Sequence, residues 1–213
     1  DEFQMSTDYF DPGYTGEPIQ TSTHRVKEGW AIGNFFGLHS MGLNSAGKWI
    51  VERYNYDENG NVVSRFPDLA ENATSADWQV LGNGVPLYYA NWNNNFRFKN
   101  FDLAITMRGA FGFQVLNYQK LFYGNPTIQY NVLKCAFDKI DVVDEYTGQK
   151  TGEKTYISDS QRYISYYIEN GDYWKIDNVT LGYTLPIKNK SIVKNVRFYG
   201  SLHNLATITK YSG

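Results

Sequence analysis

The longest regular pattern of apolar and polar residues in the chain runs from Tyr88 to Phe111. Apolar side chains alternate with hydrogen-bonding or charged ones on both sides of a two-residue break at Lys99 and Asn100. Because a period of two is the signature of a β-strand, the pattern predicts one long β-hairpin. Its apolar face would carry Tyr88, Ala90, Trp92, Asn94, Phe96, Phe98, Phe101, Leu103, Ile105, Met107, Gly109 and Phe111.

A two-residue turn also fixes the register of the two strands, because the residues that flank it pair directly. Phe98 is therefore expected opposite Phe101, and the apolar faces of both strands then coincide. The same register places opposite charges and amides together on the polar face. The expected pairs are Phe96 with Leu103, Asn94 with Ile105, Trp92 with Met107, Arg97 with Asp102, and Asn91 with Arg108.

The length of these strands leaves two kinds of sheet open. A run of about 11 residues at about 3.3 Å each spans roughly 36 Å, whereas strands of soluble proteins usually have about 5 to 6 residues. Tilted by about 45°, such a strand crosses an apolar layer roughly 25 Å thick, the height of the lipid-facing band of an outer-membrane barrel. A soluble β-sandwich also buries one face of each strand, so the pattern by itself allows both.

Shorter patterns precede the hairpin. Residues 1–28 are polar and rich in turn residues, and are predicted to be loop. Residues 30–43 are predicted to form one strand that bends or bulges at its glycines. Residues 47–56 and 61–66 flank the turn sequence DENG and predict a second, shorter hairpin.

The part after the hairpin is less regular. Residues 113–123 have apolar positions at roughly helical spacing and predict a short helix. Residues 124–171 are predicted to be the longest irregular segment, with only brief structured candidates, and long loops of this kind are usually functional or disordered. Strands are then expected over 173–186 and 196–209, with a bulge near Asp177 because the alternation changes phase there.

Composition excludes nucleic-acid binding as an expected function and a transmembrane helix as an expected element. Twenty basic and 22 acidic residues give a net charge of −2 with interspersed signs, so nucleic acid is not an expected partner. No run of 18 apolar residues exists to form a transmembrane helix, although alternation would hide membrane-spanning strands from that criterion. Aromatic residues make up 17% of the chain, which suits either membrane-interface girdles or surfaces that stack on sugars.

No catalytic, cofactor or metal site is expected. His24, His39 and His203 fall in separate segments, with no carboxylate or cysteine at ligand spacing. Residues 57–61 partly match a calcium loop, but the glycine comes too early and the final glutamate is missing, so a hairpin turn is the preferred interpretation. Cys135 has no partner for an intrachain disulfide and is interpreted as an ordinary thiol. We therefore expect that the protein is not an enzyme.

Three segments, 28–42, 77–112 and the pair 172–186 with 195–213, resemble the carboxy-terminal part of the SusC/RagA family of TonB-dependent outer-membrane transporters. The most specific part is LGYTLP, followed at short distance by a strand that ends in HNLATITKY. The sequence departs from the family where DENGNV stands in place of an Asp- and Gly-rich segment. The plug, the segment that engages TonB and the final barrel strand have no counterpart in it, so the resemblance is to a fragment of a larger protein.

The resemblance implies an all-β fold that forms part of a large antiparallel transmembrane β-barrel of about 22 strands. Residues 1–28 would be loop, 29–112 barrel strands and loops, 113–171 a long extracellular loop, and 172–209 the penultimate barrel hairpin. The family imports glycan oligosaccharides or peptides. It works with a SusD-like surface lipoprotein and with the TonB complex, which the amino-terminal part engages.

The resemblance also assigns the two faces of the predicted strands. The turns at 99–100 and 188–194 would be periplasmic, and residues 113–171 would contact lipoprotein or substrate; no substrate-binding residue is assigned. The alternative is a soluble carbohydrate-binding β-sandwich module, which would stay monomeric in solution without detergent. Outer-membrane lipid is expected at Trp92, Phe96, Phe98, Phe101, Leu103, Ile105, Leu181, Tyr183 and Phe198, and the lumen or plug at Asn91, Asn93, Asn95, Arg97, Asp102, Thr106, Arg108, Thr180, Arg197 and His203.

Overall fold

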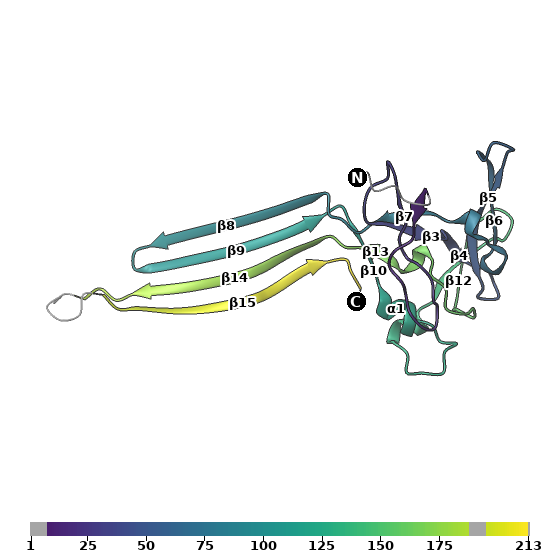
Figure 1. Ribbon diagram of the computed structural model, residues 1–213. Coiled ribbons are helices and arrows are strands. Elements are labelled where there is room, and N and C mark those ends of the chain that lie inside the picture. Colours follow the sequence, from purple (N-terminus) through teal and green to yellow (C-terminus); the bar gives the residue numbers. More distant parts are fainter. Residues whose placement is uncertain (1–7, 188–194, 213) are drawn as a thin grey trace. The chain divides into compact units, whose positions relative to one another are not determined.

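The structure is a computed structural model that describes residues 8–187 and 195–212 (Figure 1). The chain is all-β apart from one α-helix and short 3₁₀ turns. It divides into two compact units, which are described separately. The core unit comprises Asp1–Val85, Gln114–Glu169 and Ser212–Gly213, and the sheet unit comprises Pro86–Phe113 and Asn170–Tyr211.

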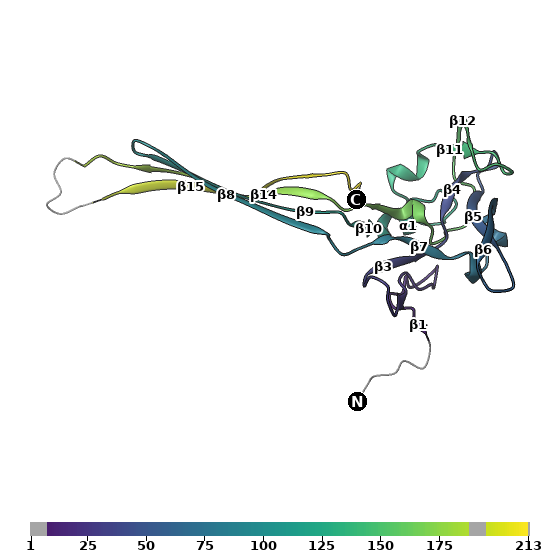
Figure 2. The same cartoon turned by 90° about the horizontal axis from the view of Figure 1, so that it is seen from above.

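The sheet unit is one antiparallel sheet of four long strands in the order β15-β14-β9-β8. The strands remain side by side in both views (Figure 1, Figure 2). The predicted hairpin is confirmed, as are both later strands. The bounds are Tyr88–Phe98 for β8, Phe101–Phe111 for β9, Tyr173–Thr184 for β14 and Arg197–Thr209 for β15.

The predicted register of the hairpin is also confirmed. Phe98 pairs with Phe101 and Trp92 pairs with Met107, so the apolar positions of β8 and β9 lie on one face. Lys99, the first residue of the turn, has φ of 54°, the left-handed conformation that tight two-residue turns require. The second predicted turn, at 188–194, lies outside the described residues.

The predicted bulge lies at Asp177. Ile176 pairs with Met107 and Asn178 pairs with Thr106, so Asp177 is an extra residue relative to β9. One extra residue reverses which face the following side chains occupy. The bulge therefore places the apolar side chains of the early part of β14 on the same face as those of the later part. It does so although the sequence alternation of the two parts is out of phase.

The core unit contains a five-stranded sheet in the order β12-β11-β4-β5-β6. The pairing of β4 with β11 is parallel and the other three pairings are antiparallel. The bounds are Ser40–Leu43 for β4, Trp49–Tyr56 for β5, Val62–Leu69 for β6, Ile140–Val143 for β11 and Lys150–Thr155 for β12.

Smaller elements complete the described part of the core unit. Three two-stranded ladders are β1 with β2, β3 with β7, and β10 with β13. Their bounds are Tyr9–Phe10, Val26–Lys27, Asn34–Gly37, Gln79–Asn83, Gln114–Leu116 and Ile168–Asn170. Helix α1 spans Tyr118–Tyr123, and 3₁₀ turns span Ala70–Asn72, Ser75–Asp77, Lys134–Phe137 and Ser165–Tyr167.

A buried hydrophobic cluster holds the core unit together. Trp49 at the start of β5 is fully buried, and its ring lies 5.0 Å from that of Tyr166. Because large apolar side chains from distant segments leave water together, their burial fixes these segments to one another. The cluster is Phe35, Leu43, Trp49, Val51, Ala70, Leu116, Leu121, Ile157, Tyr163, Ile164 and Tyr167.

Two sequence predictions for the core unit differ from the structure. Residues 30–43 form two strands, β3 and β4, in different sheets rather than one bent strand. The expected irregularity at a glycine is present, because the β4–β5 register shifts between Ser40 and Gly42, where Gly42 has φ of 148°. Residues 29–112, expected to be barrel strands and loops, are divided between the two units after Val85.

The segment 113–171 has more structure than its irregular pattern indicated. It contributes β10 to β13 and α1, the predicted short helix, and it supplies buried residues to the core. These buried positions come one or two at a time, as at Leu121, Ile157 and Tyr167, so neither a helical nor a strand period can develop. Residues 8–28 likewise contain β1 and β2 rather than loop alone.

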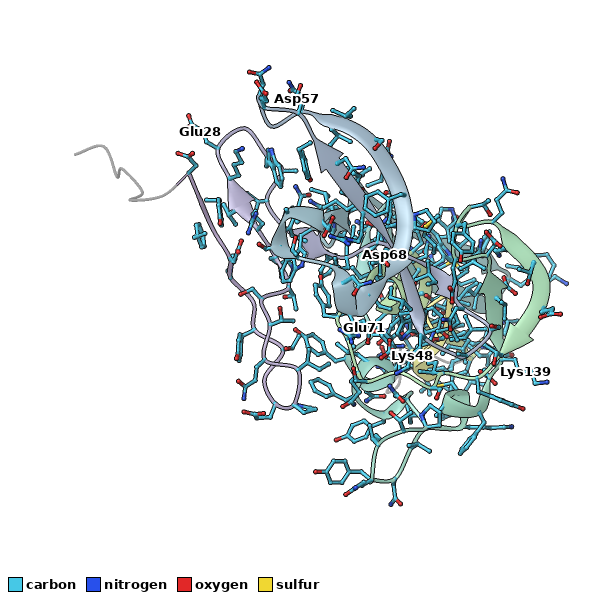
Figure 3. The ribbon with its side chains drawn as sticks, turned by 90° about the vertical axis from the view of Figure 1, so that its right-hand side faces the viewer. Glu28, Lys48, Asp57, Asp68, Glu71 and Lys139 are labelled. Carbon is cyan, nitrogen blue, oxygen red and sulfur yellow. The ribbon has the colours of Figure 1, made fainter. Side chains whose placement is uncertain are left out.

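The shorter predicted hairpin is confirmed as β5 and β6. Asp57 lies at its tip (Figure 3). Its Oδ1 accepts the backbone N–H groups of Asn59 at 2.9 Å and Asn61 at 2.8 Å, so this carboxylate orders the turn.

Within the described residues, no helix has the length and apolar character needed to cross a membrane.

Candidate functional site

The candidate site is the sheet unit, whose two faces differ in chemistry along four strands. Directly paired residues point to the same face of a sheet, so the register assigns every paired position to a face. All nine residues predicted to face lipid share one face. From the turn end, the rows of this apolar face are Phe98-Phe101-Tyr183-Phe198, Phe96-Leu103-Leu181-Gly200, Asn94-Ile105-Val179-Leu202, Trp92-Met107-Ile176-Ala206 and Ala90-Gly109-Trp174-Ile208.

Aromatic rings lie at both ends of this apolar face. At the turn end, the rings of Phe101 and Tyr183 are 4.7 Å apart. At the other end, Phe111 stacks on Trp174 at 6.0 Å, and Phe111 pairs with Tyr88. Ten residue steps of about 3.3 Å separate the two ends, so a tilt of about 45° gives a height of roughly 23 Å.

No second layer covers the apolar face within the described residues of the sheet unit. Every residue of β15 is exposed, and Phe98 is 71% exposed. A β-sandwich buries one face of each sheet against the other. Within its described residues, the sheet unit therefore lacks the second sheet that the alternative prediction of a sandwich requires.

The opposite face carries all the residues predicted to face the lumen. Between its charged ends lies a band of amides and hydroxyls, in which Thr180 Oγ1 and Ser201 Oγ are 2.8 Å apart. From the turn end, the rows of this polar face are Arg97-Asp102-Gly182-Tyr199, Asn95-Ala104-Thr180-Ser201, Asn93-Thr106-Asn178-His203, Asn91-Arg108-Lys175-Thr207 and Tyr89-Ala110-Tyr173-Thr209.

The ion pair of Asp102 crosses a strand. Arg97 lies opposite Asp102 as predicted, but the hydrogen-bonded partner of Asp102 is Arg197 of β15, whose Nε donates to Oδ1 at 3.0 Å. The guanidinium passes over Gly182 of β14, where an added Cβ would contact both charged groups. The sequence pattern missed Gly182, because a glycine in a strand indicates close approach without identifying what approaches.

A second charged group surrounds the bulge. Arg108 Nε lies 3.0 Å from Asp177 Oδ2, and Lys175 Nζ lies 3.8 Å from the other carboxylate oxygen. Asn91 is opposite Arg108 as predicted, but the charge that neutralises Arg108 comes from the extra residue of the bulge. Alternation could locate the bulge but not assign this role to its side chain.

The core unit contains a pocket of ≈ 850 Å³. One wall is the turn at Glu17 and Pro18, and the others come from the end of α1, the loop that follows it, and the segment after Asp159. Sequence analysis did not find it, because it joins three distant segments that have no shared period. Its lining residues are Glu17, Pro18, Phe122, Tyr123, Gln129, Tyr130, Asn131 and Gln161.

The described residues contain no group of three or more His, Cys, Asp or Glu side chains that could hold a metal ion. His24 lies beside Thr23, with Nδ1 2.7 Å from Oγ1, and its ring is 4.6 Å from that of Phe35. Burial lowers the pKa of His24. His203 is on the polar face of β15, so these histidines remain in separate surroundings.

The chain is similar to known proteins in sequence and in fold. No protein-family model matches the chain. It is 29% identical over 216 residues to the TonB-dependent receptor P3 of Formosa agariphila. This alignment covers 97% of this chain and 20% of the receptor. It is 25% identical over 186 residues to the TonB-dependent receptor SusC of Bacteroides thetaiotaomicron. This alignment covers 82% of this chain and 17% of SusC.

Solved structures with the same fold include the RagAB peptide importer in its closed-closed state, with a TM-score of 0.70, 16% identity and coverage of 98% of this chain and 22% of that chain. A structure of the RagAB peptide transporter gives a TM-score of 0.70 at 17% identity, over 97% of this chain and 21% of that chain. The relatives are named as receptors and transporters, which agrees with the expectation of no enzyme. The predicted resemblance is confirmed: over most of its length, the chain is similar to a segment, about one fifth, of SusC/RagA-like TonB-dependent receptors.

Proposed function

We propose that this chain is part of an outer-membrane TonB-dependent receptor and that its sheet unit crosses the membrane as four strands of a closed β-barrel of about 22 strands. The observation that carries the proposal is the apolar face, which has a row of four aromatic rings at the turn end, mostly apolar rows in the middle, and the rings of Tyr88, Phe111 and Trp174 at the other end. Its height of roughly 23 Å suits the apolar band of outer-membrane barrels, which is about 25 Å tall and flanked by aromatic girdles.

Both edges of the sheet are unpaired in the described residues, and closure into a barrel would pair them. β8 and β15 are the edge strands, and each carries a row of backbone groups without a neighbouring strand. Such groups need partners in lipid, where no water is present, and barrel closure supplies them. The polar face then points to the lumen or to a plug inside it, and the apolar face points to lipid.

The direction of crossing follows from the turns. The two-residue turn at 99–100 joins β8 to β9, whereas at the opposite end of the sheet β9 and β14 are connected through the much longer segment 112–172. In outer-membrane barrels the short turns are periplasmic and the long loops are extracellular. We place Lys99 and Asn100 in the periplasm and residues 114–169 outside the cell.

The activity proposed for the whole receptor is energised import of a nutrient. It would act with a SusD-like surface lipoprotein and with the TonB complex. The names of the curated relatives, TonB-dependent receptor P3 and SusC, support this assignment, and the RagAB importer supports it through its fold. The imported substrate is a glycan oligosaccharide or a peptide.

The test compares two adjacent positions of β9. In the full-length receptor carrying Cys135→Ser, Ile105→Cys and Thr106→Cys are each labelled with the same fluorophore after reconstitution into vesicles. Brominated lipid tails should quench the label at 105 strongly and the label at 106 weakly. Equal quenching at both positions, or quenching at neither, would overturn the proposal.

A further inference from the structure

The walls of the pocket are held in place by hydrogen bonds from buried groups. Asn125 is fully buried, and its Nδ2 donates to the backbone oxygen of Asp159 at 2.9 Å. Gln161 Nε2 donates to the backbone oxygen of Phe122 at 2.5 Å, which fixes the end of α1 to this segment. These bonds fix the end of α1 and the start of the loop after it before any ligand arrives, which lowers the entropic cost of binding there.

The opposite wall is fixed in the same way. Thr15 is buried, and its backbone N–H donates to the oxygen of Thr21 at 2.9 Å, while its Oγ1 accepts the N–H of Thr21 at 3.0 Å. These bonds close the turn that presents Glu17 and Pro18. Ile19 of the same turn packs against the hydrophobic core.

The lining chemistry limits the ligand. Of the described residues that line the pocket, none is Lys, Arg or His, and the one charged side chain is the carboxylate of Glu17. An anionic ligand would therefore find no counter-charge and one repulsive group. Tyr123 and Tyr130 remain 48% and 76% exposed, and such rings offer an apolar surface with a hydrogen-bonding edge.

A peptide is a poorer fit than a sugar. No lining residue lies in a β-strand, so the pocket has no strand edge to which a peptide backbone could add. Apart from Pro18, the lining has no aliphatic side chain, and its apolar surface comes from the rings of Phe122, Tyr123 and Tyr130, whose faces can stack on sugar rings. Amides of Gln129 and Asn131 can donate and accept at once, as vicinal sugar hydroxyls do.

We propose that this pocket binds an uncharged oligosaccharide, with Tyr130 as the stacking ring and Gln129 and Asn131 as hydroxyl-binding amides. The proposal rests on the proposed function, because it names the substrate class of the receptor. A volume of ≈ 850 Å³ lies within the range of small-ligand sites, about 300 to 1,000 Å³. It accommodates a few sugar rings of a longer chain.

The experiment uses the purified full-length receptor in detergent and an array of immobilised glycans and peptides. The array carries neutral glucans, mannans, xylans and galactans, anionic alginate, pectin and sulfated galactan, and a library of short peptides. Binding to at least one neutral glycan is expected. Calorimetry with an oligosaccharide of that glycan then compares the variants.

Tyr130→Ala should weaken binding about tenfold, and Tyr130→Phe should keep most of the affinity because it retains the ring. Tyr146→Ala is the matched control, since Tyr146 is 88% exposed and does not line the pocket. Glu17→Gln should preserve binding of a neutral ligand. Loss of binding in Glu17→Gln would show that recognition depends on the carboxylate and not on the ring and the amides, and would overturn the proposal.

Other results also decide the question. Binding of anionic glycans or peptides only, no binding to any neutral glycan, or equal affinity in Tyr130→Ala and the wild type would each overturn the neutral-sugar site. The lipid-quenching test at positions 105 and 106 does not depend on ligand. A receptor that inserts correctly but fails here therefore retains the proposed function and loses only this inference.

Discussion

The core unit and the sheet unit place their large apolar residues in opposite ways. Trp49 is fully buried among side chains from several segments of the core unit. Trp92 of the sheet unit is 41% exposed, and the whole of β15 is exposed. One unit therefore removes apolar surface from water by folding, whereas the other leaves it for its surroundings to cover.

The comparison teaches that aromatic content by itself does not report the environment of a segment. Both units are rich in aromatic residues, but only the sheet unit arranges them in rows across paired strands. A contiguous apolar surface of this kind marks an interaction with lipid or protein. The stability of the sheet unit must therefore be measured in detergent or lipid. The core unit, by contrast, carries its own hydrophobic core.

The largest effect is expected from paired tryptophan substitutions. Trp49→Ala should destabilise the core unit by about 3 to 5 kcal/mol, because it opens a cavity in a closed core. Trp92→Ala should cost clearly less, because detergent or lipid can fill the space it leaves. Hydrogen exchange of the full-length receptor, read by mass spectrometry over β5 and β8, gives both values.

Equal losses of protection in the two variants would show that the sheet unit also has a sealed core and would end the distinction. Tyr56→Ala, near the exposed end of β5, controls for loss of an aromatic residue without loss of core volume.

Charge placed on each face of β9 should give the next largest effect. Leu103→Arg puts a guanidinium in the aliphatic part of the apolar face and should cost about 2 to 4 kcal/mol of stability in a bilayer. Ala104→Arg, one residue later and on the polar face, should cost much less. Urea titration of the full-length receptor in vesicles measures the difference between the variants.

Similar costs at positions 103 and 104 would mean that neither face meets hydrocarbon. Both substitutions add the same side chain to the same strand, so the change in net charge is matched.

A smaller, pH-dependent effect is expected at Asp77 of the core unit, which is 1% exposed. Burial alone would raise the pKa of this carboxyl, but N–H donors from Thr74 and Tyr54, together with Arg53, outweigh it and lower the pKa. Asp77→Asn should destabilise the core unit by about 1 to 3 kcal/mol at neutral pH, since it removes a charged acceptor of buried donors.

The sign of the pH dependence follows from the lowered pKa in the folded state. The stabilisation by Asp77 is complete above the unfolded-state pKa, about 3.9, and is lost as the pH falls through the lower folded-state value. The gap between wild type and Asp77→Asn in hydrogen-exchange stability should therefore narrow below about pH 4. A gap that stays constant into acid would contradict this account; Glu71→Gln, an exposed neighbour, serves as the control (Figure 3).

The sheet unit could be predicted from sequence almost completely, whereas the core unit could not. In β8 and β9 the period of two persists over 11 residues each, and the two-residue turn fixes the register. In the core unit, all four residues of β3 are buried, so no alternation exists there. The burial of Leu121 and Tyr167 depends on contacts between segments far apart in the chain.

The same limit applies to the candidate site. The division into two faces follows from local alternation and was predicted for every assigned residue. The partner of Asp102 could not be predicted, because Arg197 lies 95 positions away and reaches it only across Gly182. The pocket at Tyr130 depends in turn on the packing of three segments, which no local pattern encodes.

The bulge at Asp177 has a consequence for how such a sequence can change over evolution. Substitutions along β14 alter one side chain each, but a single-codon insertion or deletion would exchange the side chains of the apolar and polar faces over part of the strand. A second compensating insertion or deletion nearby would restore them. Recombination within β14 must therefore preserve which side chains lie on each face, both before and after Asp177. Exchange of gene segments is best tolerated when the crossover falls in a turn.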